Sequence, residues 1–349
     1  MRSKSSQNAV NIINFITFLV IVIGAAALFI VLSGFAGLKT FSLSFSDTFD
    51  PQLKASPQTG KYFTLTQDQA TQLQNVQGVE AFSKELEERV YLTHKQKSHV
   101  AYIKGIDTVY SRVTQIDSAI YWGKWATADQ QGVVGLGIAN MLGLTINDYR
   151  SPLVVLAPKP GVGSPSLRAK PYNQLSLIMS GVYAVEENLD KKYVFADLPL
   201  VQALLERQDN QFSGINFKLA PEAVPEAIRP QLNKILGDGV VLKNRQEQNS
   251  TLYRMLNTEN LATYLIFTLV LIIALFNVVG AIIMMILDKQ QNSKTLYSLG
   301  TTIPEIRRIY FVQGLIITGF GGFLGILLAS ILIWSQLFFG WLKITPSLA

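Results

Sequence analysis

Three long stretches without a charged side chain constrain this chain more than any other feature. They cover residues 5–38, 261–287 and 309–342. A helix needs about 20 mainly apolar residues to cross the hydrocarbon core of a bilayer, so each stretch is long enough to span it. Hydrophobic residues make up 49% of the chain, and their surplus is concentrated in these stretches. The sequence therefore predicts a membrane protein with three transmembrane helices.

Charges beside these stretches predict the orientation. Arg2 and Lys4 precede the first stretch, and residues 288–308 carry four basic against two acidic side chains. Basic residues favour the cytoplasmic side, so we expect the N-terminus and residues 288–308 to be cytoplasmic and residues 40–258 extracytoplasmic. A cleaved signal peptide is the alternative for the first stretch. Its apolar region would be roughly twice the usual 7 to 15 residues.

The net charge of +6 could suggest a nucleic-acid-binding protein. However, residues 39–259 contain 23 basic and 22 acidic side chains, so the basic excess lies beside the membrane stretches. This distribution argues against a nucleic-acid-binding face. The chain has no cysteine, which excludes disulfides, cysteine metal ligands and cysteine nucleophiles.

The polar segment 288–308 separates the second and third stretches. Gly300 can end one helix, and Thr302 and Glu305 have the spacing of a capping box at the start of another. Pro304 falls in the first turn, where it costs no helical hydrogen bond. We therefore expect a structured surface about the size of an interaction epitope. The alternative is a solvated turn between two membrane helices.

The extracytoplasmic segment reads as an α+β domain. Residues 61–86 and 214–244 each show a strand, an amphipathic helix, a glycine turn and a second strand, which predicts two β-α-β units in a ferredoxin-like sheet. Residues 88–107 predict a hairpin with a polar turn. The sequence of residues 132–144 predicts a short helix, and that of residues 151–158 predicts a buried strand. We interpret this middle region as a second subdomain inserted in the first.

A proline-rich connection follows the predicted buried strand. Residues 158–174 contain four prolines and two glycines between apparent strands. Proline has a fixed φ and no backbone donor, so this composition favours an exposed, extended excursion. An ordinary variable loop is the alternative.

Small residues in the third stretch predict helix packing. Gly321, Gly325 and Ala329 form a row at four-residue spacing, which lets helices approach closely in lipid. Asn277 is the one amide side chain of the second stretch, and we expect it to hold a contact between helices.

No motif in the chain predicts catalysis. The sequence lacks the G-x-x-x-x-G-K-[ST] loop that cradles nucleotide phosphates. His94 and His99 flank the predicted hairpin turn, and we expect both to be exposed polar residues rather than metal ligands. The carboxylates of residues 40–258 show no pairing that would support acid–base chemistry. We expect no enzyme activity, no bound cofactor and no metal.

Residues 276–325, FNVVGAIIMMILDKQQNSKTLYSLGTTIPEIRRIYFVQGLIITGFGGFLG, resemble the FtsX-type permease core of ABC transporters, and most closely its lipoprotein-releasing LolC/LolE branch. Residues 135–149, GLGIANMLGLTINDY, resemble a run in the extracytoplasmic domain of LolC, LolE and MacB permeases. Asn147 stands where that family has glycine, a mild departure because asparagine tolerates left-handed turns.

This resemblance implies the domain organisation. Residues 1–39 would hold the N-terminal segment and first transmembrane helix, and residues 40–258 a MacB-like extracytoplasmic domain. That domain would divide into a Porter subdomain, about 40–105 and 190–250, and a Sabre subdomain, about 106–189. Residues 259–349 would form the FtsX-like core with helices two and three. The family has a fourth transmembrane helix that this sequence lacks, so we expect these residues alone to fall short of a competent permease.

The resemblance also implies a function. The chain would be the inner-membrane subunit of an ABC transporter that extracts lipoproteins and passes them to a periplasmic carrier. A separate cytoplasmic subunit would bind and hydrolyse ATP. The partners would be this ATPase, a second permease subunit that is either a copy or a paralogue, the lipoproteins, the carrier and membrane lipids. The alternatives are a MacB-like efflux pump, disfavoured because no ATPase domain is fused, and an FtsX-like regulator of cell-wall hydrolases, whose extracytoplasmic domain is smaller.

Two sets of residues carry roles by this resemblance. Those expected to couple to the ATPase are Lys294, Leu296, Tyr297, Leu299, Gly300, Glu305 and Arg307. Those expected to form a carrier-binding hook, as in LolC, are Pro158, Pro160, Gly161, Pro165, Arg168 and Pro171.

Overall fold

The computed structural model describes residues 8–159 and 171–340, which form two compact units. The helical unit comprises the described residues up to Phe41 and from Arg254 onward. The sheet unit comprises the described residues of Ser42–Tyr253. The predicted division of the sheet unit into Porter and Sabre subdomains stays a prediction.

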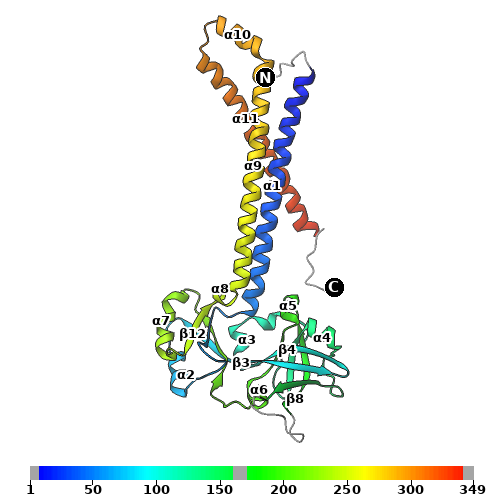
Figure 1. The fold of residues 1–349 in the computed structure, drawn as a ribbon, viewed down its shortest axis with the longest axis vertical. Helices are drawn as coiled ribbons and strands as arrows, with labels where there is room; N and C mark the ends of the chain where they lie inside the picture. Colours follow the sequence, from blue (N-terminus) through cyan, green and yellow to red (C-terminus); the bar gives the residue numbers. More distant parts are fainter. Residues whose placement is uncertain (1–7, 160–170, 341–349) are drawn as a thin grey trace. The chain divides into compact units, whose positions relative to one another are not determined.

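Three long helices dominate the helical unit (Figure 1). They are α1 (Asn8–Phe49), α9 (Ser250–Asp288) and α11 (Ile303–Phe339), and the short α10 (Gln290–Ser298) joins the last two. The parts long and apolar enough to cross a membrane are Phe18–Ser44, Ser250–Met284 and Ile303–Phe339. The described chain therefore contains three candidate membrane spans. The first span was expected to end near Lys39, but its helix continues to Phe49 because no proline or glycine interrupts residues 39–49.

The sheet unit is built on a ten-stranded sheet with the order β12-β1-β11-β3-β4-β9-β6-β8-β5, in which β7 pairs with β3 and β8. A separate two-stranded sheet pairs β10 with β2. The strands are β1 (Leu53–Pro57), β2 (Phe63–Thr64), β3 (Val79–His94), β4 (Lys97–Ile106), β5 (Ile120–Gly123), β6 (Gln131–Gly135), β7 (Leu153–Pro158), β8 (Tyr172–Tyr183), β9 (Tyr193–Asp197), β10 (Gln211–Phe212), β11 (Gly214–Leu219) and β12 (Val240–Asn244). The helices are α2 (Gln67–Gln74), α3 (Tyr110–Val113), the 3₁₀ helix η1 (Ile116–Ala119), α4 (Leu136–Leu142), α5 (Glu187–Asp190), α6 (Leu198–Leu204), α7 (Pro225–Leu236) and α8 (Arg245–Gln248).

One end of the sheet contains two interleaved β-α-β units. The neighbours β12, β1, β11 and β3 are antiparallel throughout, so β1-α2-β3 and β11-α7-β12 form a ferredoxin-like arrangement. Both helices lie on one face, side by side in Figure 1, and Gln69 Nε2 of α2 donates to the carbonyl of Ile235 in α7 at 2.9 Å. The expectation that the start of residues 61–86 supplies the first strand was wrong. Leu53–Pro57 supply it instead, because Leu53 and Ala55 bury fully against the core, whereas Phe63 pairs only with β10.

The predicted hairpin and the elements after it are present. Strands β3 and β4 pair through a two-residue turn, where Lys95 adopts a φ of 54°. Helix α4 and strand β7 occupy the regions predicted for a short helix and a buried strand, and alternate residues of β7 face the core. His94 corrects a prediction, because it is only 3% exposed. It continues the inward alternation of Val90 and Leu92 along β3.

Candidate functional site

A structured connection joins the second and third membrane-spanning helices. Helix α10 ends at Ser298, and Gly300 follows with a φ of 97°, a left-handed conformation that glycine adopts without strain. The amide of Thr301 donates to the Leu296 carbonyl at 3.1 Å, and that of Gly300 donates to the Tyr297 carbonyl at 3.0 Å. These two bonds are the Schellman ending of a helix.

The next helix starts immediately after this ending. The amide and hydroxyl of Thr302 both donate to Oε2 of Glu305 at 2.8 Å, and Pro304 lies in the first turn of α11. Ser293 of α10 and Tyr310 of α11 are linked by a hydrogen bond of 2.6 Å between their hydroxyls. The connection is therefore an ordered helix–turn–helix rather than an unstructured turn (Figure 1).

Most residues expected to couple to an ATPase are brought together on this connection. Leu296, Tyr297 and Leu299 are 40%, 60% and 78% exposed, although all three are large and apolar. Lys294 and Arg307 are also exposed. An exposed apolar group beside basic side chains is typical of a protein-interaction surface. The coupling role itself stays a prediction.

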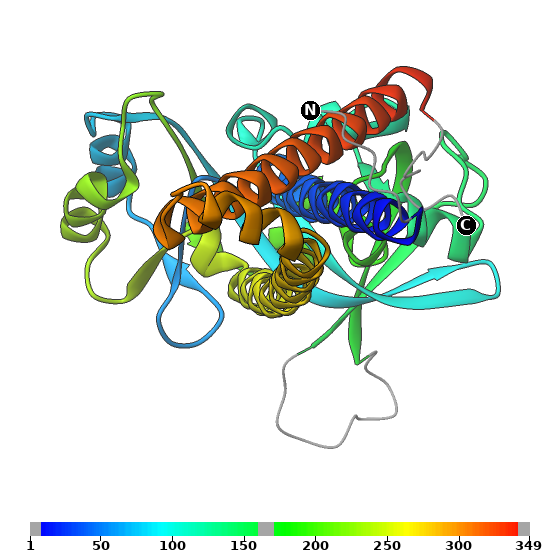
Figure 2. The same ribbon diagram turned by 90° about the horizontal axis from the view of Figure 1, so that it is seen from above.

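Helix α11 crosses α1 (Figure 2), and small residues of α11 lie in that contact. Gly321, Gly325 and Ala329 are buried, and a Cβ added to Gly325 would lie 2.5 Å from the carbonyl oxygen of Val22 in α1. The rings of Phe18 and Phe320 stack at 6.1 Å in the same contact. Asn277 lies in α9, but its side chain is outside the described part of the structure.

The base of the proline-rich connection is a closed strand pair. Pro158, the last residue of β7, pairs with Tyr172, the first of β8, and the amide of Lys159 donates to the Pro171 carbonyl at 3.0 Å. The other predicted hook residues, Pro160, Gly161, Pro165 and Arg168, lie outside the described residues.

A groove of about 670 Å³ opens beside this base. It is lined by residues of β3, by Pro158, Lys159 and Asn173 from the two paired strands, and by Tyr62, Leu204 and Arg207. On β3 the lining residues 88–91 follow those paired with β11, and Tyr91 is the first of those paired with β7. Sequence reasoning missed this groove, because it forms where six separate segments meet.

Charged side chains lie beside an aromatic ring in the groove. The guanidinium of Arg207 lies 4.4 Å from the ring centroid of Tyr62, and Lys61 pairs with Glu88 at 2.7 Å. Lys159 pairs with Glu206 at 3.1 Å. Burial and the neighbouring Glu88 carboxylate raise the pKa of Tyr62 to about 12, so its phenol stays protonated. The groove thus offers aromatic surface together with both signs of charge.

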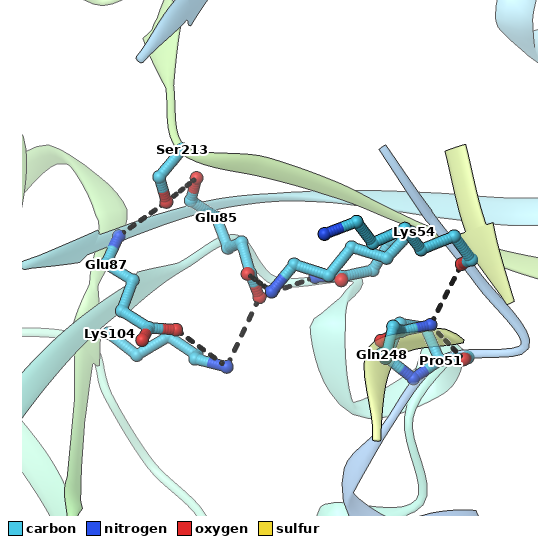
Figure 3. Close-up of polar contacts among 9 residues, drawn as sticks. Pro51, Lys54, Glu85, Glu87, Lys104, Ser213 and Gln248 are labelled. Carbon is cyan, nitrogen blue, oxygen red and sulfur yellow. Dashed lines mark hydrogen bonds and ion pairs between the residues drawn. The ribbon is translucent and has the colours of Figure 1, made fainter. Parts of the chain in front are cut away.

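A second polar cluster is buried inside the sheet (Figure 3). Glu85 accepts from Nδ2 of Asn216 at 2.7 Å and forms ion pairs with Lys54 and with Lys104. Burial alone would raise the pKa of Glu85, but the ammonium groups of Lys104 and Lys54 outweigh it and lower the pKa to about 2. Glu85 is therefore ionised at neutral pH.

Aromatic rings complete the surroundings of Lys104. Its ammonium nitrogen lies 4.8 Å from the ring centroid of Tyr193 and 5.2 Å from that of Phe49, the last residue of α1. It also lies 3.4 Å from a carboxylate oxygen of Glu87. Burial lowers the pKa of Lys104, but the carboxylate of Glu85 outweighs this and raises it well above its ordinary value. Each charge is paired, so the cluster resembles a structural ion-pair network more than an acid–base site.

Comparison with known proteins identifies relatives. The sequence profile of the MacB-like periplasmic core domain matches residues 14–235. The chain is 25% identical over 206 residues to the lipoprotein-releasing system transmembrane protein LolC of Neisseria meningitidis serogroup B. The aligned region covers 58% of this chain and 48% of that relative. It is 24% identical over 239 residues to the lipoprotein-releasing system transmembrane protein LolE of Haemophilus influenzae. That alignment covers 68% of this chain and 56% of LolE. The chain thus spans about half the length of these curated relatives.

Solved structures give more distant similarities. The periplasmic region of MacB from Actinobacillus actinomycetemcomitans matches 60% of this chain and 94% of its own, with 13% identity and a TM-score of 0.42. The extracellular domain of the ABC-type transporter YknZ from Gram-positive bacteria matches 56% of this chain over 99% of its own length, with 15% identity and a TM-score of 0.37.

Proposed function

The chain belongs to the family of proteins with a MacB-like periplasmic core domain, and we propose that it is the membrane subunit of an ABC transporter that extracts lipoproteins from the inner membrane and passes them to a periplasmic carrier. The observation that carries this proposal is the sequence similarity to lipoprotein-releasing transmembrane proteins from two organisms. Three candidate membrane spans beside a folded domain agree with a permease subunit.

The proposed orientation puts the N-terminus and residues 288–308 in the cytoplasm, and it puts the part of residues 40–258 that lies outside the candidate spans in the periplasm. The excess of basic residues near Arg2 and in residues 288–308 supports it. The chain has no native cysteine, so single cysteines report sidedness cleanly. A cysteine at the exposed Asn292 should resist an impermeant thiol reagent in intact cells, while one at Ser98 should react. The opposite pattern would overturn this orientation.

The energy source in this proposal is a separate ATPase that docks on the α10 connection. A lipid anchor is held by about 0.8 kcal/mol for each buried CH₂ group, so its release requires work. An ordered helix–turn–helix with exposed Leu296, Tyr297 and Leu299 can transmit that work to the membrane helices. In this scheme ATP binds to the partner, and this chain is a non-catalytic subunit without a cofactor of its own.

The carrier in this proposal docks at the connection between β7 and β8 and on the groove at its base. Lys159 and Arg207 give that groove cationic groups, and Tyr62 gives it an aromatic surface. The proposal also includes a second permease subunit, either another copy or a paralogue.

The decisive experiment is ATP-dependent transfer of a lipoprotein. The complex that co-purifies with this chain from native membranes would be reconstituted in liposomes with an acylated lipoprotein and its soluble carrier. We expect ATP to move the lipoprotein into the soluble fraction bound to the carrier. Efflux of small molecules without lipoprotein release would favour a MacB-like pump, and ATPase-dependent activation of a cell-wall hydrolase would favour an FtsX-like regulator. Either result would overturn the proposed function.

A further inference from the structure

One arginine of the groove beside β3 is held in a fixed position. After helix α6, Glu206 adopts a φ of 54°, a left-handed conformation that ends the helix and turns the chain. The amide of Arg207 then donates to the Gln202 carbonyl at 2.9 Å. The guanidinium lies 4.4 Å from the ring centroid of Tyr62, and the hydroxyl of this tyrosine donates to Glu88. Arg207 is therefore positioned before any ligand arrives.

The carboxylates that contact the groove are already paired with other groups. Glu88 accepts from Lys61 at 2.7 Å, and Glu206 accepts from Lys159 at 3.1 Å. Among the residues that the structure describes, no carboxylate lies within ion-pair distance of Arg207, and its buried Nε has no hydrogen-bond acceptor. The guanidinium thus keeps donors for an anionic group that enters the groove from outside.

The adjoining edge of β3 lacks a strand partner over a short stretch. Strand β11 pairs with β3 as far as Glu85, and β7 pairs with it from Tyr91 onward. Backbone groups of alternate residues face this side of β3, because the Ser213 amide donates to the Glu85 carbonyl at 3.0 Å. Arg89 follows the same alternation, and its amide donates to the carboxylate of the adjacent Glu88 at 3.1 Å. In this stretch of the described chain the backbone is open to an added strand.

The groove combines this edge with apolar and basic side chains. Residues 88–91 of β3 line it over about 10 Å of extended strand, so three or four residues of an extended peptide can lie alongside them. The side chains of Val90, Leu204 and Leu205 add apolar surface. Four of the lining residues are basic and one is acidic, so the groove favours an acidic ligand.

We propose that the groove binds an extended peptide segment of a partner protein, whose backbone pairs with β3 at Arg89 and whose carboxylate side chain binds Arg207. The two contacts are close together, because Tyr62, which lies under Arg207, donates to Glu88. Strand addition supplies main-chain hydrogen bonds, and the side-chain contact supplies specificity. The inference deepens the proposed carrier contact and rests on the proposed function for the identity of the partner, whereas the groove itself sets the chemistry of the ligand.

A phosphate group is the competing ligand, because a guanidinium also binds phosphate with two hydrogen bonds. A phosphate would use neither the open backbone of Arg89 nor the apolar side chains beside it. These two features favour a peptide.

The first test measures the binding of short fluorescent peptides to the full chain in nanodiscs by fluorescence polarisation. One peptide alternates valine and threonine around a central glutamate, and its matched control has glutamine at that position. Wild type should bind the glutamate peptide roughly tenfold to hundredfold more tightly, the range expected of a hydrogen bond to a charged group. Methylation of alternate backbone amides in the peptide should also weaken binding. Equal affinity for the two peptides, binding of neither, or undiminished binding after methylation would overturn the proposal.

The second test assigns the preference to Arg207. Arg207→Gln should bind the two peptides alike, whereas Arg207→Lys, which keeps the charge, should retain part of the preference. Lys234→Gln is the matched control, because Lys234 is an exposed cation on α7 that does not line the groove, and this variant should behave as wild type. The unfolding temperature of each variant verifies that it is folded. A full preference in Arg207→Gln would overturn the proposal, and so would displacement of the peptide by inorganic phosphate but not by acetate.

Peptide binding and lipoprotein transfer can fail independently. Peptide binding requires neither ATP nor a lipoprotein, so its failure would remove the proposed ligand of the groove and leave the transfer assay as it stands. Failure of transfer in a chain that still prefers the glutamate peptide would instead overturn the proposed function and leave this inference in place.

Discussion

The ammonium nitrogen of Lys104 lies 3.5 Å from Oε2 of Glu85, and both side chains are buried in the sheet. Removing one partner of a buried ion pair leaves the other charge uncompensated, which typically costs about 3–5 kcal/mol. Glu85 keeps its ion pair with Lys54, so we expect Lys104→Met to lower the free energy of unfolding of the full chain by up to this amount. Lys54→Met should cost less, because the Lys54 side chain is 21% exposed and water can replace part of its role.

A double variant separates loss of the ion pair from loss of packing. Lys104→Met combined with Glu85→Gln should recover part of the stability lost by Lys104→Met alone, because a buried carboxylate that keeps only Lys54 as its ion-pair partner is removed. Thermal unfolding of the four proteins measures this. Additive losses would show that the two side chains do not stabilise each other.

The same pair predicts how stability depends on pH. The pKa of Glu85 is about 2 in the folded protein and 4.5 ordinarily. A carboxylate whose pKa falls on folding stabilises the protein above its ordinary pKa and loses that contribution as the pH falls towards the folded value. The difference in unfolding free energy between wild type and Glu85→Gln should therefore be largest above about pH 4.5 and shrink towards pH 2. A difference that stays constant over this range would contradict the lowered pKa.

The sequence predicted the parts of the fold that local signals specify. The capping pair Thr302–Glu305 and the glycine ending at Gly300 are short-range patterns, and both are present. The Glu85 cluster could not be predicted, because Lys54, Asn216 and Lys104 reach it from three other strands. Which residues face each other there depends on strand order and register.

The misplaced first strand has a similar cause. The sequence around Phe63 has as much strand character as Leu53–Pro57, and only the completed sheet decides between them. Leu53–Pro57 pair with both β11 and β12, whereas the strand that contains Phe63 pairs only with the two residues of β10. The burial of His94 likewise depends on which face of β3 meets the core, which is set by tertiary packing.

The contact between α11 and α1 predicts a sharp difference between two glycines. A Cβ at Gly325 would lie 2.5 Å from the Val22 carbonyl oxygen and 2.8 Å from Ala25 Cβ, whereas one at Gly322 would meet nothing within 4 Å. Overpacking of this kind typically costs about 1–3 kcal/mol. We expect Gly325→Ala to lower the unfolding temperature in nanodiscs and Gly322→Ala to leave it unchanged or raise it slightly. Equal effects would argue against close packing at Gly325.

The α10 connection predicts a loss of ATPase coupling without a loss of folding. Leu296 is 40% exposed and no residue of α10 is buried, so Leu296→Asp should not disturb the helical unit. It should reduce the amount of ATPase that co-purifies with the chain, because a carboxylate would enter an apolar contact. Gln291→Asp is the matched control, an exposed polar residue on the same helix. If both variants co-purify as much ATPase as the wild type does, the α10 connection only joins the two helices and does not bind the ATPase.

The connection between β7 and β8 predicts a separation of carrier binding from folding. Deleting residues 161–166 leaves the closing pair Pro158–Tyr172 and the hydrogen bond from Lys159 to Pro171 in place. The contacts that close the strand pair do not involve the deleted residues, so we expect the unfolding temperature of the full chain to stay the same. Binding of the soluble carrier should be lost, and lipoproteins should remain in the inner membrane of cells that depend on this variant. If the shortened chain still binds the carrier with wild-type affinity, the docking site lies elsewhere, and the groove beside Tyr62 and Arg207 becomes the next segment to alter.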